Sequence, residues 1–184
     1  MGKRGKGGIF MKKSSFSNLK VLTVSAMLTA VSIVIGILCK NYLNFGNGLF
    51  RITFENFPIL MSGILFGPVV GACVGIAADV ISYILSTQSF AISPIVTLGA
   101  AAIGAVSGVV SHLLRSKSTE KQIVFSGMIA HFIGSVCIKS AGLYLYYGAA
   151  VLVRVPLYTV IAAFEILLLL FLFRRKSFSS LIQK

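Results

Sequence analysis

Long apolar stretches separated by short polar breaks run through the chain from about residue 20 to residue 173. A membrane-spanning helix needs about 20 mainly apolar residues. Six segments approach or reach that length, namely 20–39, 50–66, 69–86, 92–114, 122–146 and 154–173. The second is the shortest, and the Gly67-Pro68 pair ends it. The pattern predicts an all-α polytopic membrane protein with six transmembrane helices in one bundle.

The composition agrees with this pattern. Of the 184 residues, 57% are hydrophobic and only 11% are charged, whereas a soluble domain needs about a quarter of its residues charged. A cytosolic enzyme of ordinary design is therefore excluded. High hydrophobicity also excludes a disordered chain. Cys39, Cys73 and Cys137 lie in apolar stretches without metal-ligand spacing, so we expect them to be small core residues.

The positive charge, formally +13, is concentrated between the apolar segments. Six basic residues lie in the first twenty positions, three in the break at 115–121 and four at the end of the chain. An even number of helices places these three clusters on one side of the membrane, and Lys40, Arg51, Lys139 and Arg154 on the other. Because basic residues favour the inner side, we expect both termini in the cytoplasm.

This pattern also defines the expected domains. Residues 1–18 form a basic cytoplasmic leader that we expect to be poorly ordered, 19–176 form the membrane domain, and 177–184 form a cytoplasmic tail. The first apolar segment is too long for a typical signal peptide. Basic clusters that punctuate apolar runs offer no basic, polar face for phosphates, so nucleic-acid binding is not expected.

Several ionisable residues fall inside the predicted spans, where each costs at least about 2.5–3.5 kcal/mol and so needs a partner or a function. Arg51 and Glu55 are expected to open the second helix, one turn apart on one face, and Arg154 to open the sixth. Lys139 is expected near the outer boundary. Three cations and one carboxylate therefore converge on the outer half of the bundle, and two further carboxylates, Asp79 and Glu165, fall beneath them near mid-membrane.

Aromatic residues accompany these charges: Phe50, Phe54 and Tyr83, together with Tyr144, Tyr146 and Tyr147 at the end of the fifth segment. One interpretation is an outward-open pocket for a flat polar ligand that carries negative charge. The alternative is ion pairing between helices, Arg51 with Glu55 and Lys139 with Asp79, with the aromatics forming an interfacial belt.

Small residues recur at four-residue spacing. Such faces let helices approach closely in lipid, and we expect packing inside the bundle for Gly71 and Gly75 and for the face of Ala100, Gly104 and Gly108. For Ala26 and Ala30 in the first segment, packing and docking to another membrane protein are both possible.

Motifs for nucleotide binding and hydrolysis are missing from the sequence. There is no GxxxxGK[ST] loop, and no nucleophile–base pair is evident. His112 and His131 fit hydrogen-bonded helix residues better than metal ligands. Clear inverted halves are absent too, which makes a self-sufficient secondary transporter less natural.

The block RITFENFPILMSGILFGPVVGACVGIAADVISYIL at 51–85 resembles the substrate-binding S components of energy-coupling factor (ECF) vitamin transporters, specifically the folate type. AMLTA, from Ala26 to Ala30, matches the AxxxA motif of that family, and SPIVTLGAAAIGAVSG at 93–108 fits the same group. The resemblance extends over about residues 18–175.

The resemblance implies a transport subunit of a bacterial cell membrane without catalytic activity or cofactor of its own. It would capture a vitamin from outside with high affinity and deliver it inward by toppling in the membrane. Through the AxxxA face it would dock on a transmembrane coupling protein that carries two cytosolic ATPases, which would hydrolyse ATP.

Folate chemistry fits the candidate residues. Asp79 or Glu55 could accept hydrogen bonds from the pterin, and Phe50, Phe54 and Tyr83 could stack on its rings. Lys139, Arg154 or Arg51 would pair with the glutamate carboxylates. In the loop at 40–49, Gly46 and Gly48 would permit a gate, for which the family resemblance is the main support.

The sequence is also compatible with alternatives to a folate-specific S component. The first is an S component for another vitamin or an aromatic precursor. The second is a stand-alone proton-coupled carrier that uses Asp79 and Glu165 as relays; a small membrane enzyme is a weaker third.

Overall fold

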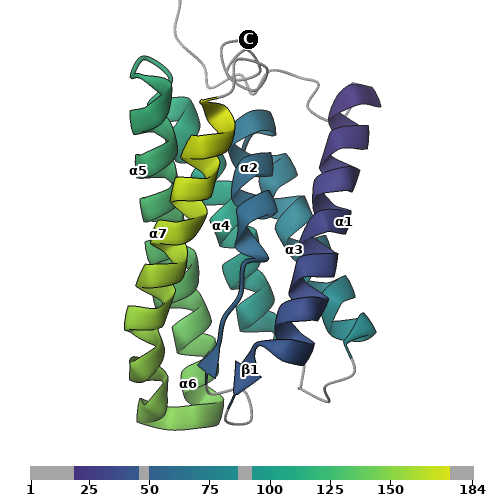
Figure 1. The fold of residues 1–184 in the computed structure, drawn as a ribbon, viewed down its shortest axis with the longest axis vertical. Helices are drawn as coiled ribbons and strands as arrows, with labels where there is room; N and C mark the ends of the chain where they lie inside the picture. Colours follow the sequence, from purple (N-terminus) through teal and green to yellow (C-terminus); the bar gives the residue numbers. More distant parts are fainter. Residues whose placement is uncertain (1–18, 46–49, 87–92, 175–184) are drawn as a thin grey trace, which may run out of the picture.

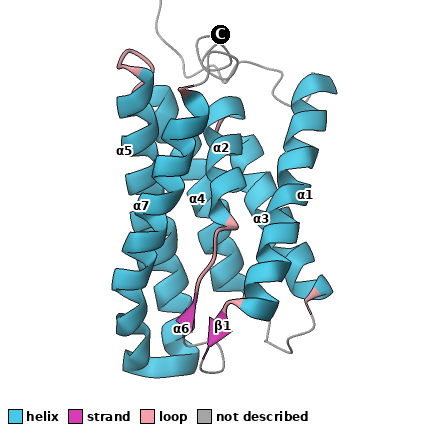
Figure 2. Cartoon of the chain, in the orientation of Figure 1, coloured by secondary structure: helices cyan, strands magenta, loops and turns pink. Residues whose placement is uncertain are grey.

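The computed structural model describes residues 19–45, 50–86 and 93–174. The predicted leader at 1–18, the tail at 177–184 and the two loop glycines Gly46 and Gly48 lie outside the described residues. The described chain is almost entirely helical (Figure 2), with one short hairpin. The prediction of a helical membrane bundle is therefore confirmed, with the hairpin as an addition.

The elements run up and down in one bundle (Figure 1). In chain order they are α1 (Leu19–Tyr42), β1 (Asn44–Phe45), β2 (Phe50–Arg51), α2 (Asn56–Phe66), α3 (Pro68–Leu85), α4 (Pro94–Leu113), α5 (Thr119–His131), the π-helical segment η1 (Phe132–Lys139), α6 (Ser140–Tyr147), the 3₁₀ segment η2 (Gly148–Val153) and α7 (Arg154–Phe173). Among the described residues, five continuous helical stretches are long and apolar enough to cross a membrane.

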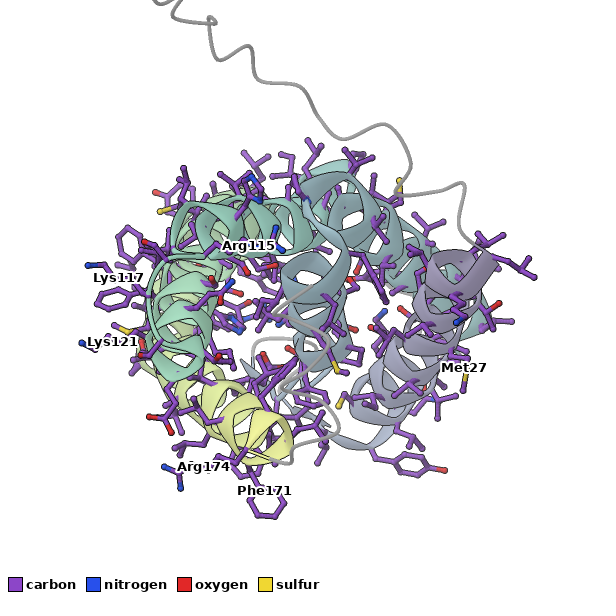
Figure 3. The ribbon with its side chains drawn as sticks, turned by 90° about the horizontal axis from the view of Figure 1, so that it is seen from above. Met27, Arg115, Lys117, Lys121, Phe171 and Arg174 are labelled. Carbon is purple, nitrogen blue, oxygen red and sulfur yellow. The ribbon has the colours of Figure 1, made fainter. Side chains whose placement is uncertain are left out.

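The bundle has two distinct ends. The start of α1, the turn between α4 and α5 and the end of α7 lie together at the end that we call the terminal end (Figure 1). The hairpin lies at the opposite end, which we call the hairpin end. Arg115, Lys117 and Lys121 lie in or next to the turn between α4 and α5, and Arg174 directly follows α7, so all four belong to the terminal end; Figure 3 labels them in a view from above. The side of the membrane that this end faces stays a prediction.

The second span differs from the prediction. Residues 50 and 51, expected to begin a helix, instead pair antiparallel with 45 and 44, and α2 begins only at Asn56. Arg51 and Glu55 are therefore not one helical turn apart. The β-branched pair Ile52-Thr53 favours extended backbone, and the Ile52 N–H donates to the Leu43 carbonyl at 3.1 Å.

With 11 residues, α2 is only about 16 Å long at 1.5 Å per residue, well short of the hydrocarbon thickness of about 30 Å. Non-helical backbone is tolerated at membrane depth only where protein or a polar cavity covers it. The short helix and the non-helical residues before it are therefore both expected in the interior of the bundle. Thr53 is indeed buried. The short helix thus brings an irregular segment, with its polar groups, into the middle of the protein.

A continuous helix was predicted for the fifth span at 122–146, and the structure interrupts it. The helix begins at Thr119, turns π-helical from Phe132 to Lys139 and returns to α-helical geometry at Ser140. Single π-helical turns are rare and frequently mark functional sites. Here the π-helical segment begins directly after one buried ionisable residue, His131, and ends at another, Lys139.

Small residues join the central helices, as predicted. A Cβ atom on Gly104 of α4 would lie 2.1 Å from the carbonyl oxygen of Gly71 on α3, and one on Gly75 would lie 2.4 Å from that of Ala100. The α3–α4 pair is thus in direct backbone contact. At the α2–α3 junction Gly67 has a φ of 94°, which glycine adopts without strain.

At the edge of the bundle, α1 packs against α2 and α3 (Figure 1). Its buried residues form one stripe, Ser25, Ser32, Gly36, Cys39 and Lys40. Ala26 and Ala30 lie on the other side and are exposed. Packing inside the bundle therefore does not account for this pair. Of the cysteines expected in the core only Cys39 is buried; Cys73 and Cys137 are exposed, because they point away from the bundle interior.

Candidate functional site

Ionisable side chains are buried in the interior of the bundle, where a membrane protein usually has few of them. Among the described residues these are Lys40, Glu55, Asp79, His131, Lys139, Arg154 and Glu165. They come from six different helices or connecting segments, so only the folded bundle brings them together. Buried charges persist where they are paired or have a function.

Glu55 is the centre of the first group. Its Oε2 lies 3.7 Å from Lys40 Nζ, and its Oε1 lies 4.0 Å from Lys139 Nζ. Lys139 Nζ also donates to Asn56 Oδ1 at 2.9 Å, and Lys40 Nζ donates to Ser82 Oγ. Two ammonium groups thus share one carboxylate. We call Lys40, Glu55, Asn56 and Lys139, with Asp79 and its partner Thr97, the buried charge cluster.

Local backbone geometry positions these side chains. Lys40 lies in the last turn of α1, and Glu55 directly precedes α2. The helix dipoles favour a cation at the first position and an anion at the second. Lys139 ends the π-helical segment η1. The end of α1, the start of α2 and the end of η1 thus bring these side chains together.

Two glycines leave the space that the cluster occupies. A Cβ atom on Gly36 of α1 would lie 2.7 Å from Glu55 Oε2. One on Gly99 of α4 would lie 2.5 Å from the Lys139 Cγ atom. Side chains larger than hydrogen at these positions would collide with the charged groups, so the cluster depends on both glycines.

Asp79 extends the cluster towards α4. Its Oδ2 accepts a hydrogen bond from Thr97 Oγ1 at 2.7 Å. Its Oδ1 is buried and has no hydrogen-bond partner among the described residues. A buried acceptor left without a donor is costly, so Asp79 Oδ1 is the clearest position at which a ligand N–H group would be stabilised.

Arg154 begins α7 and is buried, as are Lys40 and Lys139 at the ends of α1 and η1. Its Nη1 lies 3.5 Å from the Tyr158 hydroxyl, and its guanidinium carbon lies 5.4 Å from the centroid of the Tyr147 ring. A planar guanidinium can bind a carboxylate through two parallel hydrogen bonds.

A second buried pair lies between α5 and α7. His131 Nε2 is 2.7 Å from Glu165 Oε2, and His131 Nδ1 is 3.2 Å from Ser135 Oγ. Glu165 has no exposed surface. His131, which the sequence presented as an isolated histidine, therefore has a carboxylate partner 34 positions later in the chain.

The structure brings some of the predicted site residues together and separates others. Glu55 and Lys139 are in contact, and the Tyr83 ring lies 4.0 Å from Lys40 Nζ. The alternative pairing of Lys139 with Asp79 is not found, because Lys139 faces Asn56 and Glu55 while Asp79 bonds to Thr97.

Two of the predicted aromatic site residues, Phe54 and Tyr144, make no side-chain hydrogen bond, ion pair or ring contact with the buried charge cluster in the described part of the chain. Phe54 packs on Phe164 of α7, with ring centroids 5.4 Å apart. Tyr144 is 57% exposed on the outer surface of α6 and does not join the buried charge cluster. The side chains of Phe50 and Arg51 lie outside the described residues, although their backbone forms β2.

Sequence reasoning missed Lys40, Asn56, Ser82 and Thr97 as members of the site. Lys40 was counted only for topology, because it follows the apolar run directly. Its position at the last turn of a helix was a usable signal, since it could snorkel inward as well as outward. The three uncharged residues gave no comparable signal.

Comparisons with known proteins agree with this architecture. The family model for the ECF transporter substrate-specific component matches residues 20–182. A search of curated proteins found no match. Among solved structures, the chain is similar to one described as the crystal structure of FolT bound with folic acid, with a TM-score of 0.61 and 20% identity. That similarity covers 82% of this chain and 88% of the other.

At that identity the similarity concerns the fold, and the match of the family model concerns almost the whole described bundle. Among the described residues, five membrane-length helical stretches and the shorter apolar helix α2 fit a multi-pass membrane protein. The chain belongs to the family of substrate-specific components of ECF transporters.

Proposed function

We propose that this S component binds folate or a related pterin from the outer side of a bacterial cell membrane. The observation that carries the proposal is the buried charge cluster, in which Lys40 and Lys139 flank Glu55 and Asp79 keeps an acceptor oxygen without a partner. Lys40 lies in the last turn of α1 and Glu55 directly precedes α2, so the cluster lies in the half of the bundle where the hairpin joins these two helices. With both termini in the cytoplasm, that half faces outward.

Folate carries hydrogen-bond donors at one end and two carboxylates at the other, which matches both kinds of group in the cluster. Asp79 Oδ1 would accept from the pterin amino group or ring N–H. Lys139 and Arg154 would bind the glutamate carboxylates, and Tyr83 would contact a ring. Charge-assisted hydrogen bonds of this kind contribute about 1.5–3 kcal/mol each. The fold similarity to a folic-acid-bound protein supports the same choice of ligand.

Energy for transport would come from partner subunits. No GxxxxGK[ST] loop is present in the sequence, so the chain would rely on two cytosolic ATPases bound to a coupling protein. Ala26 and Ala30 are exposed on α1 and are the proposed docking positions. A close approach of a partner helix to these two alanines is sterically easy. Gly46 and Gly48 remain the proposed hinge of a gate.

The test is mass spectrometry of small molecules that co-purify with the protein, followed by binding assays. We expect a folate to be retained, and we expect thiamin, riboflavin and pantothenate not to bind. Retention of one of those three in place of folate would overturn the ligand assignment and leave the family unchanged.

Proton-coupled transport without partners is a second candidate, because the buried His131–Glu165 pair could exchange a proton. Proteoliposomes that contain this chain alone distinguish the two. Uptake driven by a pH gradient would favour the proton-coupled carrier, whereas the S-component proposal expects no uptake until the coupling protein and ATPases are added.

A further inference from the structure

A groove of about 520 Å³ lies on the outside of the bundle at the terminal end, between α4 and α5. Its walls are apolar: Val110, Leu113 and Leu114 from the end of α4, and Phe125 and Ile129 from α5. Leu113 and Phe125 are 74% and 50% exposed. Apolar exposure is ordinary on a membrane protein, so the walls alone do not identify what fills the groove.

Two lysines at the groove indicate which kind of molecule fills it. Lys117 and Lys121 line it together with the apolar residues, and both are exposed. They point away from the bundle on its outer side (Figure 3). Neither has a carboxylate within ion-pair distance among the described residues. Two ammonium groups thus lie beside an apolar groove at the terminal end of the bundle.

The nearest acidic residue in sequence does not neutralise them. Glu120 faces α7, where its Oε1 lies 3.4 Å from Arg174 Nε. The turn that carries Lys117 is fixed by backbone hydrogen bonds, from Lys117 N–H to the Leu114 carbonyl at 2.9 Å and from Leu114 N–H to the Val110 carbonyl at 3.0 Å. These bonds fix the backbone from which Lys117 projects, next to the start of α5, which carries Lys121.

We propose that this groove, which we call the α4–α5 groove, binds an anionic phospholipid of the surrounding membrane. One acyl chain would lie along Leu113, Phe125 and Ile129, and the headgroup phosphate would accept hydrogen bonds from Lys117 and Lys121. Basic pockets between transmembrane helices at the cytoplasmic surface bind anionic headgroups in this manner. A free phosphate would use only the lysines, whereas a lipid uses both parts of the groove.

The site is separate from the proposed partner surface. Met27, next to Ala26 on α1, lies on the opposite side of the bundle from Lys117 and Lys121 (Figure 3). A lipid in the α4–α5 groove could therefore remain bound while α1 contacts a coupling protein. Lipid binding in the α4–α5 groove does not depend on the proposed vitamin, because no residue of the groove belongs to the buried charge cluster.

Native mass spectrometry of the full chain, purified in mild detergent with added lipid, tests the proposal. Dioleoyl phosphatidylglycerol should remain bound under conditions that remove dioleoyl phosphatidylcholine. K117Q and K121Q should each weaken phosphatidylglycerol binding roughly fivefold, since a basic residue near an anionic surface contributes about 1 kcal/mol. The double variant should lose it by roughly 25-fold, and K117R/K121R should retain it.

The matched control is K20Q, because Lys20 lines a second apolar groove at the same end, formed by α1 and α2. It should leave phosphatidylglycerol binding unchanged. Equal binding of the two lipids, or an equal loss in K20Q, would overturn the proposal. So would complete displacement by glycerol phosphate, which has no acyl chain, or a dimer that dissociates in K117Q/K121Q, which would mean that a second copy covers the groove.

Discussion

The two halves of the bundle use glycine in opposite ways. Towards the terminal end, Gly71 and Gly104 allow the backbones of α3 and α4 to touch, so no space remains between the helices. Towards the hairpin end, Gly36 and Gly99 make room for the side chains of Glu55 and Lys139, and Gly99 also lies close to the Gly134 backbone of η1. Glycine thus allows close helix packing in one half and makes room for charged side chains in the other.

Because of this difference, the half that stabilises the fold is distinct from the half that is proposed to bind the ligand. Direct backbone contact supplies the close packing on which helix association in lipid depends. Buried ions contribute little net stability, because their desolvation offsets their attraction. A bundle that keeps the buried charge cluster in one half and packs α3 against α4 in the other can therefore hold a polar site without losing its fold.

The largest effect is expected from Glu55→Ala, which leaves Lys40 and Lys139 buried around a missing carboxylate. Removing one partner of a buried ion pair costs about 3–5 kcal/mol, and thermal unfolding in detergent would measure it. Glu120→Ala is the matched control, since the Glu120–Arg174 pair is mostly exposed and should cost less than about 1 kcal/mol. Equal losses would contradict the distinction between buried and exposed pairs.

The backbone contact between α3 and α4, towards the terminal end, should be disrupted by one added methyl group. Gly104→Ala places a Cβ atom 2.1 Å from the Gly71 carbonyl oxygen and should destabilise the bundle by about 1–3 kcal/mol. Val109→Leu, on the exposed face of the same helix, should change stability by less than about 0.5 kcal/mol. A stable Gly104→Ala variant would mean that α3 and α4 are not in backbone contact.

Gly99→Ala tests the glycine that makes room for a charge. The added methyl group would lie 2.5 Å from the Lys139 Cγ atom and 2.9 Å from the Gly134 carbonyl oxygen, so Lys139 and the adjacent backbone of η1 must shift. We expect folate affinity to fall about tenfold, or about 1.4 kcal/mol. Equilibrium binding with purified protein measures the change. An affinity equal to that of the wild type would show that Lys139 does not need its present position to bind the ligand.

The smallest effect is expected from Tyr144→Ala. Because Tyr144 is exposed on α6, its loss should change folate affinity by less than about twofold, which is within the usual range for surface substitutions. A larger loss would place this ring in the binding site and would restore the original expectation from the sequence.

The sequence predicted the helices well, because long apolar runs leave few alternatives in a membrane. It also predicted Glu55, Asp79 and Lys139 as polar residues inside the bundle. It could not predict the pairing of His131 with Glu165, since contacts between distant residues depend on the final packing. The hairpin was missed because two-residue strands within an apolar run have no periodicity of their own.

Tyr144 lies away from the buried charge cluster for a simple geometric reason. It follows Lys139 by five residues of the α-helix α6, and five residues correspond to about 140° around an α-helix with 3.6 residues per turn. Lys139, which ends the π-helical segment, faces inward, and Tyr144 faces outward.

The binding of two ligands by Lys139→Met protein tests the central claim most directly. Folate carries the glutamate carboxylates, and free pterin lacks them. If Lys139 binds a carboxylate, the variant should bind folate roughly 10- to 150-fold more weakly, corresponding to about 1.5–3 kcal/mol, and should bind pterin as the wild type does. Unchanged folate affinity, or equal losses for folate and pterin, would contradict the assignment of this buried cation to the acidic end of the vitamin.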